Sequence, residues 1–280
     1  MKQEKKKKNF STIILIVILL VGLFLLLYPT LSNYWNSFHQ SRAIASYSEA
    51  VAQVDNDKYE KILAEVAAYN QVLAGTGNKW FLSDDEMKKY NSLLNVTGTG
   101  IMGYIEIPKI DCSLPIYHGT EDSVLQIAIG HVAGTAMPVG GINTHCVLSG
   151  HRGLPSAKLF TELDEMELGD LFMLRVLDEV FTYSVDQILI VEPNDVSALE
   201  IEQGQDLCTL VTCTPYGINT HRLLVRGHRV ENLKETPTLR VTADATQIEP
   251  LLVAPIVAIP ILLVLLVFLL IDTRKGKKKK

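Results

Sequence analysis

Two apolar stretches, one near each end of the chain, constrain this sequence more than any other feature. Residues 13–27 form an unbroken apolar run, which Phe10 and Tyr28 extend to roughly the thickness of a membrane. Residues 251–271 form a second run, which only two prolines interrupt, and membrane helices tolerate proline. Each run is long enough to span a bilayer, so we predict a folded segment held between two transmembrane helices.

Basic residues flank both runs on the side of the chain terminus. Lysines 5–8 precede the first run, and one arginine and five lysines follow the second run within residues 272–280. Because positive flanks stay on the cytoplasmic side, we expect a two-pass protein of the cell membrane with both termini in the cytoplasm and an extracytoplasmic middle. The residues after the first run, YPTLS, lack a small-x-small cleavage site, which favours a retained anchor over a cleaved signal peptide.

The charge of the chain is distributed unevenly. The whole sequence has a net charge of −5, but the segment between the two basic tails holds 15 basic and 29 acidic residues, a net charge of −14. A surface this acidic cannot neutralise a row of phosphates, so nucleic acid is excluded as a partner. We interpret the lysine tails as topology signals beside anionic lipid.

The middle of the chain changes from a helical pattern to a β pattern. Residues 41–74 carry apolar residues at helical spacing with a break predicted near Asn56, and Ser83 with Glu86 forms a capping box that opens a short helix. A Gly/Thr linker at residues 97–100 marks a domain boundary. About eight short strands follow over roughly 130 residues, which predicts a mainly β fold, a closed barrel with short helices.

Within this barrel we expect two of the short helices at residues 121–129 and 156–163, and a strand at 144–149. The predicted organisation has seven segments in chain order. They are a cytoplasmic basic tail (1–9), a transmembrane helix (10–28), an extracytoplasmic helical segment (29–100), the barrel (101–232), a linker (233–250), a second transmembrane helix (251–271) and a second basic tail (272–280).

A strand pair near the end of the barrel brings a cysteine next to an arginine. Residues 207–213 and 222–225 read as buried strands, and the Pro, Gly and Asn between them indicate a turn. In an antiparallel pair, Cys213 closes the first strand and Arg222 opens the second, so the fixed cation favours the thiolate and can hold an oxyanion. The alternative is that Cys213 only fills the core and Arg222 is a surface charge.

His151 is the third candidate. It follows the strand at 144–149 between Gly150 and Gly153, so its imidazole is expected on a loop at a strand end, where it can exchange a proton near neutral pH. The alternative is a solvated loop histidine. We find no carboxylate placed to orient this ring, so the pattern does not predict a papain-like relay.

We expect neither a structural disulfide nor a metal or cofactor. The four cysteines show no framework spacing, and Cys208 and Cys213, five apart on one strand, point to opposite faces. The spacings of His118, His131 and His145 match no zinc-ligand pattern.

Four stretches of the sequence resemble the signatures of class C, pilus-assembling sortases. They are residues 102–110 (MGYIEIPKI), 149–160 (SGHRGLPSAKLF), 209–217 (TLVTCTPYG) and 220–227 (THRLLVRG). The resemblance covers roughly residues 40–232 and extends to the two-anchor layout. It implies an eight-stranded sortase barrel with an N-terminal helical lid segment.

The resemblance also implies a reaction. Cys213 would be the nucleophile, His151 the general acid/base and Arg222 the oxyanion or substrate stabiliser of a cysteine transpeptidase. Such an enzyme cleaves an LPXTG-like sorting signal after Thr and transfers the acyl group from a thioester to a pilin lysine. Pilin subunits are therefore the expected partners on a Gram-positive cell surface. The alternatives are a housekeeping sortase that attaches proteins to peptidoglycan and a non-catalytic scaffold that binds pilins.

The sequence departs from the family at the lid. Pilus sortases carry an Asp-Pro-aromatic motif there, and the corresponding residues are Asn78, Lys79 and Trp80, so the aromatic is present without Asp or Pro. We predict a lid held mainly by Trp80; the alternative is a core aromatic between two helices. Thr212, just before the nucleophile, either lines the substrate pocket or satisfies the strand.

Overall fold

We describe the protein from a computed structural model, which describes residues 2–232. The predicted second transmembrane run, residues 251–271, lies outside this range. The chain divides into two units, and the unit that carries the barrel begins at Trp35. Within the described residues, one helix is long and apolar enough to cross a membrane, and its apolar part starts at Ile14. That helix is a candidate for the N-terminal anchor.

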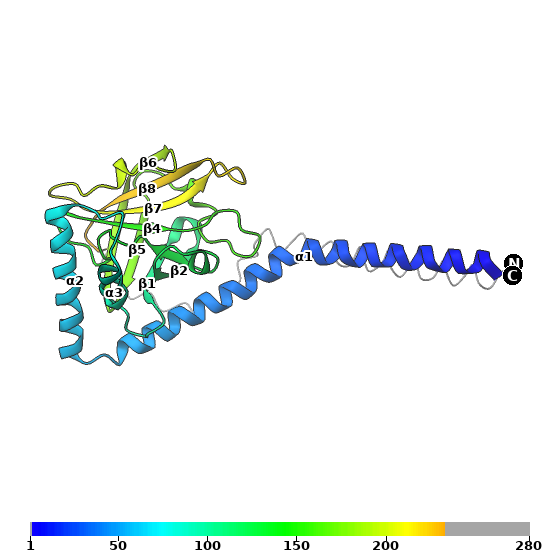
Figure 1. Ribbon diagram of the computed structural model, residues 1–280, viewed down its shortest axis with the longest axis horizontal. Coiled ribbons are helices and arrows are strands. Elements are labelled where there is room, and N and C mark those ends of the chain that lie inside the picture. The colour runs from blue at the N-terminus through cyan, green and yellow to red at the C-terminus, as the bar shows by residue number, and fades with distance from the viewer. Residues whose placement is uncertain (1, 233–280) are drawn as a thin grey trace. The chain divides into compact units, whose positions relative to one another are not determined.

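Three helices precede the barrel: α1 (Lys2–Ala52), α2 (Asn56–Thr76) and α3 (Asp84–Ser92) (Figure 1). The helix predicted at 41–74 is therefore two helices. The break falls just before Asn56, because the Asp55 carboxylate caps α2 by accepting the Lys58 amide at 2.8 Å. The predicted capping box of α3 is confirmed, with both of its reciprocal hydrogen bonds formed.

Eight strands form one closed barrel, as predicted. Their order around the barrel is β1-β2-β3-β4-β7-β8-β6-β5. The strands are β1 (Ile101–Ile107), β2 (Cys112–His118), β3 (Ile129–His131), β4 (Thr144–Ser149), β5 (Leu171–Val176), β6 (Glu179–Val191), β7 (Asp206–Thr214) and β8 (His221–Arg229). Short helices decorate the connections: η1 (Pro108–Ile110), α4 (Asp122–Leu125), η2 (Leu163–Glu165) and η3 (Ser197–Leu199).

One predicted short helix is shorter than expected and another is wrong. The helix expected at 121–129 ends at Leu125, because the chain then extends as β3 to pair with β2 and β4. The helix expected at 156–163 is replaced by turns that lead to η2. Leu159 has a φ of 42°, which interrupts a right-handed helix, and the Phe160 amide donates to the His151 carbonyl at 3.1 Å instead.

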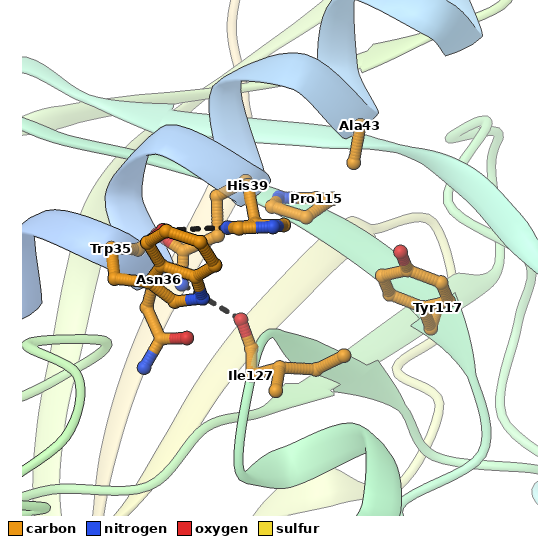
Figure 2. A pocket seen from close by; sticks show the side chains of 8 residues that line it. Trp35, Asn36, His39, Ala43, Pro115, Tyr117 and Ile127 are labelled. Carbon is orange, nitrogen blue, oxygen red and sulfur yellow. Dashed lines mark hydrogen bonds between the residues drawn. The ribbon is translucent and has the colours of Figure 1, made fainter. Parts of the chain in front are cut away.

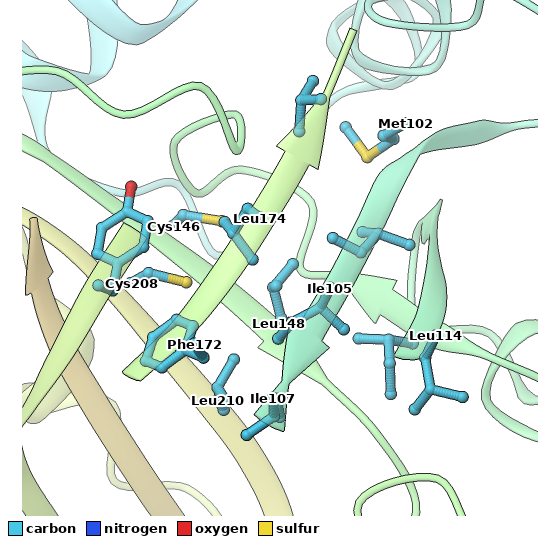
Figure 3. Close-up of a cluster of buried hydrophobic side chains, with 14 of the residues drawn as sticks. Met102, Ile105, Ile107, Leu114, Cys146, Leu148, Phe172, Leu174, Cys208 and Leu210 are labelled. Atoms are coloured by element: carbon cyan, nitrogen blue, oxygen red, sulfur yellow. The ribbon is translucent and has the colours of Figure 1, made fainter. Parts of the chain in front are cut away.

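The barrel interior is filled by alternate residues of its strands (Figure 3). The burial pattern of β5 alternates strictly, and Phe172 and Leu174 are fully buried against residues of the facing strands. Cys146 on β4 and Cys208 on β7 are register partners inside this core, and both are free thiols. Cys213 lies on the opposite face of β7 from Cys208 and is only partly buried.

Candidate active site

The parallel pairing of β4 and β7 brings His151 to Cys213. Ser149 is the register partner of Val211, so the residues two positions further along each strand are His151 and Cys213. Two hydrogen bonds continue the pairing beyond β4: the Gly150 amide donates to the Val211 carbonyl at 3.0 Å, and the Thr212 hydroxyl donates to the Gly150 carbonyl at 2.8 Å. The end of one strand therefore fixes the loop that carries the imidazole.

Thr212 is buried, and its hydroxyl donates to the Gly150 carbonyl. Gly150 itself permits this close packing. A Cβ atom at that position would lie 2.5 Å from Ile129 and 2.7 Å from Phe160, so any other residue would push the loop away from the barrel.

The antiparallel pairing of β7 and β8 places Arg222 directly opposite Cys213. The Arg222 guanidinium donates to the carbonyls of Asn219 and His221 at 3.3 and 3.1 Å. The start of β8 and the turn before it therefore hold the Arg222 guanidinium at the rim of the barrel. His151, Cys213 and Arg222 are all partly buried and occupy neighbouring positions across β4, β7 and β8.

A contact that the sequence analysis missed joins the two loops at this rim. The Arg152 guanidinium lies 5.7 Å from the centre of the Tyr216 ring and forms an ion pair with Asp164. Gly153, with a φ of 74°, brings the backbone so close that a Cβ would lie 2.9 Å from the Tyr216 ring. The sequence indicates this contact only through the positions of the two residues: Arg152 directly follows His151, and Tyr216 lies three residues after Cys213.

We call residues 78–80 the lid segment. Trp80 packs against an apolar cluster of Val147, Leu199 and Leu224, and its indole N–H donates to a Glu200 carboxylate oxygen at 3.2 Å. The Asn78 amide donates to the Leu199 carbonyl at 2.7 Å. Both ends of the lid segment are therefore attached to the connection between β6 and β7, around residues 199–200.

The apolar cluster under Trp80 lies on the same side of the sheet as the candidate site. Alternate residues of a strand face the same side, so Leu224 on β8 faces the side of Arg222, and Val211 on β7 faces the side of Cys213. Among the described residues, the hydrogen-bond partners of the Arg222 guanidinium are its own loop carbonyls and not Asn78. The lid segment thus covers the face beside the site without an ion pair to Arg222.

Lys79, in the middle of the lid segment, is held by α3 and by the connection between β3 and β4. The Lys79 amide donates to the Gly134 carbonyl at 2.9 Å, and its ammonium pairs with Glu86 at 2.6 Å. The hydrogen bonds from Lys79 and Ser83 lower the pKa of Glu86 to about 2. The next residue, Phe81, is 95% exposed and contributes no packing of this kind.

His145 contacts the backbone of Glu200, one of the two residues to which the lid segment is attached. The Thr209 hydroxyl and the His145 Nε2 are 2.7 Å apart, and Nδ1 faces the Glu200 carbonyl at 2.8 Å. A neutral ring satisfies both contacts, with Nδ1–H donating to the carbonyl and Nε2 accepting from the hydroxyl. Burial lowers the pKa of His145, in agreement with a neutral imidazole.

The remaining cysteines are less accessible to a substrate. Burial raises the pKa of Cys112 to about 12. Cys146 and Cys208 are inside the core, so Cys146 is out of reach of a substrate even though hydrogen bonds from Cys208 and His131 lower the pKa of its thiol. The residues that the structure describes include no group of three or more His, Cys, Asp or Glu side chains arranged to hold a metal ion. Cys213 is therefore the thiol available for chemistry at the rim.

Comparison with known proteins agrees with this geometry. The sortase domain family matches residues 105–230. Sortase C1 from Streptococcus agalactiae is 52% identical, with a TM-score of 0.68 over 69% of this chain and 100% of that chain. The sortase C of Streptococcus pneumoniae, described with pilin substrate specificity, is 44% identical, with a TM-score of 0.61 over 68% and 97%. A Clostridium perfringens sortase C, solved with the C-terminal cell wall sorting motif, is 40% identical, with a TM-score of 0.61 over 69% and 100%.

The closed eight-stranded barrel with a free, partly buried thiol at its rim is that of an enzyme of the cysteine transpeptidase class. The chain is a member of the sortase family, and its structural neighbours are sortases of class C.

Proposed function

We propose that this sortase polymerises pilin subunits on the outer side of the cell membrane. The observation that carries the proposal is that His151, in the loop directly after β4, lies next to Cys213 on β7, which in turn lies opposite Arg222 on β8. The S. pneumoniae and C. perfringens relatives support the substrate class, a pilin and a C-terminal sorting motif. The enzyme needs no cofactor for this chemistry.

In the first half of the reaction, the Cys213 thiolate attacks the carbonyl carbon of Thr in an LPXTG-like signal. Arg222 stabilises the oxyanion of the tetrahedral intermediate. The Thr–Gly bond then breaks, the glycine amine takes a proton from the His151 imidazolium, and an acyl-thioester remains on Cys213.

In the second half, the ε-amine of a pilin lysine attacks the thioester. His151 accepts the proton that the amine loses, and Cys213 departs as a thiolate. The product is an isopeptide bond between two subunits, so no water is consumed and the enzyme returns to its starting state.

The same proposal covers the anchoring and the lid. The apolar part of α1, which starts at Ile14, anchors the enzyme, both termini lie in the cytoplasm, and residues 251–271 form the second span. Asn78 and Trp80 restrict access to the site by covering its apolar side. Asn78 and Trp80 are attached to residues 199–200 and form no ion pair with Arg222. This attachment fits a lid that opens more readily than a proline-bearing one.

The test is to incubate the full-length protein in detergent with an LPXTG-type peptide and to measure the protein mass. An acyl adduct on Cys213 is expected, and Cys213→Ala should give none. Arg222→Lys keeps the charge but not the planar donor fork, so we expect the rate of adduct formation to fall about 10²-fold. Absence of the adduct in the unaltered protein would leave a pilin-binding scaffold as the function.

A second step separates pilus assembly from wall anchoring. A lysine-bearing pilin is added to the acyl-enzyme, and the products are separated by size. Covalent pilin multimers support the proposal. Release of the acyl group to a peptidoglycan-type amine but not to the pilin would identify a housekeeping enzyme instead.

A further inference from the structure

No residue between Asn9 and Ser41 carries a fixed charge, although a fifth of all residues in the chain are charged. These 33 residues are helical, so they extend over about 50 Å at 1.5 Å per residue. The hydrocarbon core of a bilayer is only about 30 Å thick, and about 40–45 Å with both headgroup layers. The uncharged stretch therefore continues past the hydrocarbon core and through the outer headgroup layer.

The residues at the end of this stretch have the chemistry of a membrane interface. A span of about 20 residues that begins at Ile14 ends shortly before Trp35. Trp35 and Phe38 are 65% and 55% exposed, and Arg42, the first charged residue, is exposed as well. Their spacing of three and four residues places all three on one face of α1. Tryptophan favours the interface, and arginine reaches lipid phosphates with its long side chain.

A neighbouring face of the same part of α1 is fixed to the barrel, and Trp35 lies at the edge between the two faces. The Asn36 amide donates to the Ser156 carbonyl, and the Gln40 amide donates to the Ile127 carbonyl, both at 2.7 Å. Between them lies a pocket whose lining residues include no Asp, Glu, Lys or Arg (Figure 2). Ile127, which lines this pocket beside Trp35, is 47% exposed. The barrel therefore continues the uncharged surface of α1.

This surface lies at the same end of the barrel as the candidate active site. β3 runs antiparallel to β4, with Gly130 opposite Ser149, so Ile127 before β3 lies at the end of β4 that leads to His151. Ser156, which holds α1, belongs to the loop that follows His151. Ile142, in contrast, precedes β4 and lies at the other end of the strand.

We infer that Trp35, Phe38, Arg42 and Ile127 form a lipid-contact surface that seats the catalytic domain on the membrane. The aromatic and aliphatic side chains enter the headgroup layer, and Arg42 pairs with a lipid phosphate. The segment between the basic tails has a net charge of −14, so an anionic leaflet repels most of the surface of this segment. A face without acidic residues is not repelled in this way and can approach the leaflet. The catalytic rim then faces the bilayer. The inference rests on the proposed anchoring and not on the proposed chemistry.

The experiment uses the chain's two tryptophans, Trp35 and Trp80, as depth probes. The full-length protein is incorporated into vesicles that contain phosphatidylglycerol, with bromine atoms placed either near the carbonyl end or near the methyl end of the acyl chains. Trp80→Phe leaves only Trp35 fluorescent, and Trp35→Phe leaves only Trp80. We expect bromine near the carbonyl end to quench Trp35 about twofold more than bromine near the methyl end, and neither to quench Trp80.

A second pair of variants separates a seated domain from one that is merely tethered. Ile127→Trp and Ile142→Trp are each made in the Trp35→Phe, Trp80→Phe background, and both positions are exposed enough to accept indole. Quenching at position 127 without quenching at position 142 supports the inference. If the protein enters vesicles but position 127 is not quenched, the lipid-contact surface is refuted while the anchoring stands. If the emission of the tryptophan at position 127 is blue-shifted but not quenched, the surface contacts a second copy of the chain and not lipid. If the protein does not enter vesicles, both the lipid-contact surface and the proposed anchoring are refuted.

Discussion

Removing the indole of Trp80 should open the lid segment and expose Cys213. The structure attaches this segment through the packing of Trp80 on the apolar cluster, the hydrogen bond of Trp80 to Glu200, the hydrogen bond of Asn78 to Leu199, and the contacts of Lys79 with Gly134 and Glu86. Trp80→Ala eliminates the first two and leaves the others. If the lid segment opens and closes rapidly, the rate at which a small reagent alkylates Cys213 follows the fraction of open molecules.

The magnitude follows from the buried surface. A tryptophan buries about 150–250 Å² when fully covered, so the half-buried Trp80 removes roughly 100 Å² from water. At about 25 cal/mol per Å², this contributes about 2.5 kcal/mol, and the hydrogen bond to Glu200 adds about 0.5 kcal/mol. Alanine keeps part of the contact, which leaves a net loss of about 2 kcal/mol. We therefore expect alkylation to accelerate about thirtyfold.

The assay is mass spectrometry of the intact protein during reaction with iodoacetamide. Cys213→Ala reports any labelling of the other three cysteines, which burial protects. Phe81→Ala is the matched control, because Phe81 is the adjacent aromatic and is 95% exposed. An unchanged rate in Trp80→Ala, or the same acceleration in Phe81→Ala, would show that the lid segment does not restrict access to Cys213.

Two further outcomes concern stability. Tyr90→Phe should lower the free energy of unfolding, measured in urea, by about 2 kcal/mol. The buried Tyr90 hydroxyl accepts a hydrogen bond from the Gly119 amide and donates one to the His131 carbonyl, both at 3.0 Å, and its loss leaves these groups without that partner. Tyr34→Phe, at an exposed residue, should leave the free energy of unfolding unchanged. Burial lowers the pKa of His145, so the unfolded chain binds the proton first, and stability should fall as the pH drops below the unfolded pKa of about 6.5. The slope of unfolding free energy between pH 7 and 5 should be smaller in His145→Gln, and an unchanged slope would contradict a neutral buried ring.

The parts of the site that local pattern determines were predictable from the sequence. The turn residues between two apolar strands were enough to place Arg222 opposite Cys213, which is their register in the structure. The short run at 144–149, which ends at Gly150, was likewise enough to delimit β4, and with it the position of His151 at a strand end. Each of these elements is defined by residues that are close to it in the sequence, where hydrophobic pattern and turn chemistry agree.

The parts that depend on distant partners were not predictable. The three residues of β3 have no readable period and become a strand only because β2 and β4 lie on either side of them. The lid segment is a second case. Its contacts with residues 199–200 join positions about 120 apart, and no local signal in the sequence indicates that Asn78 binds a backbone carbonyl there.

Access and reactivity are separate properties in this site. Arg222 is oriented by the carbonyls of Asn219 and His221, and the lid segment by residues 199–200, so opening one leaves the other in place. A change at Trp80 should therefore alter how often Cys213 meets a reagent and not the donor proposed to stabilise the oxyanion. Trp80→Ala should accelerate alkylation of Cys213, whereas Arg222→Ala should slow formation of the acyl adduct because it removes that donor. Slower adduct formation in Trp80→Ala as well would mean that the lid segment also holds Arg222 in place.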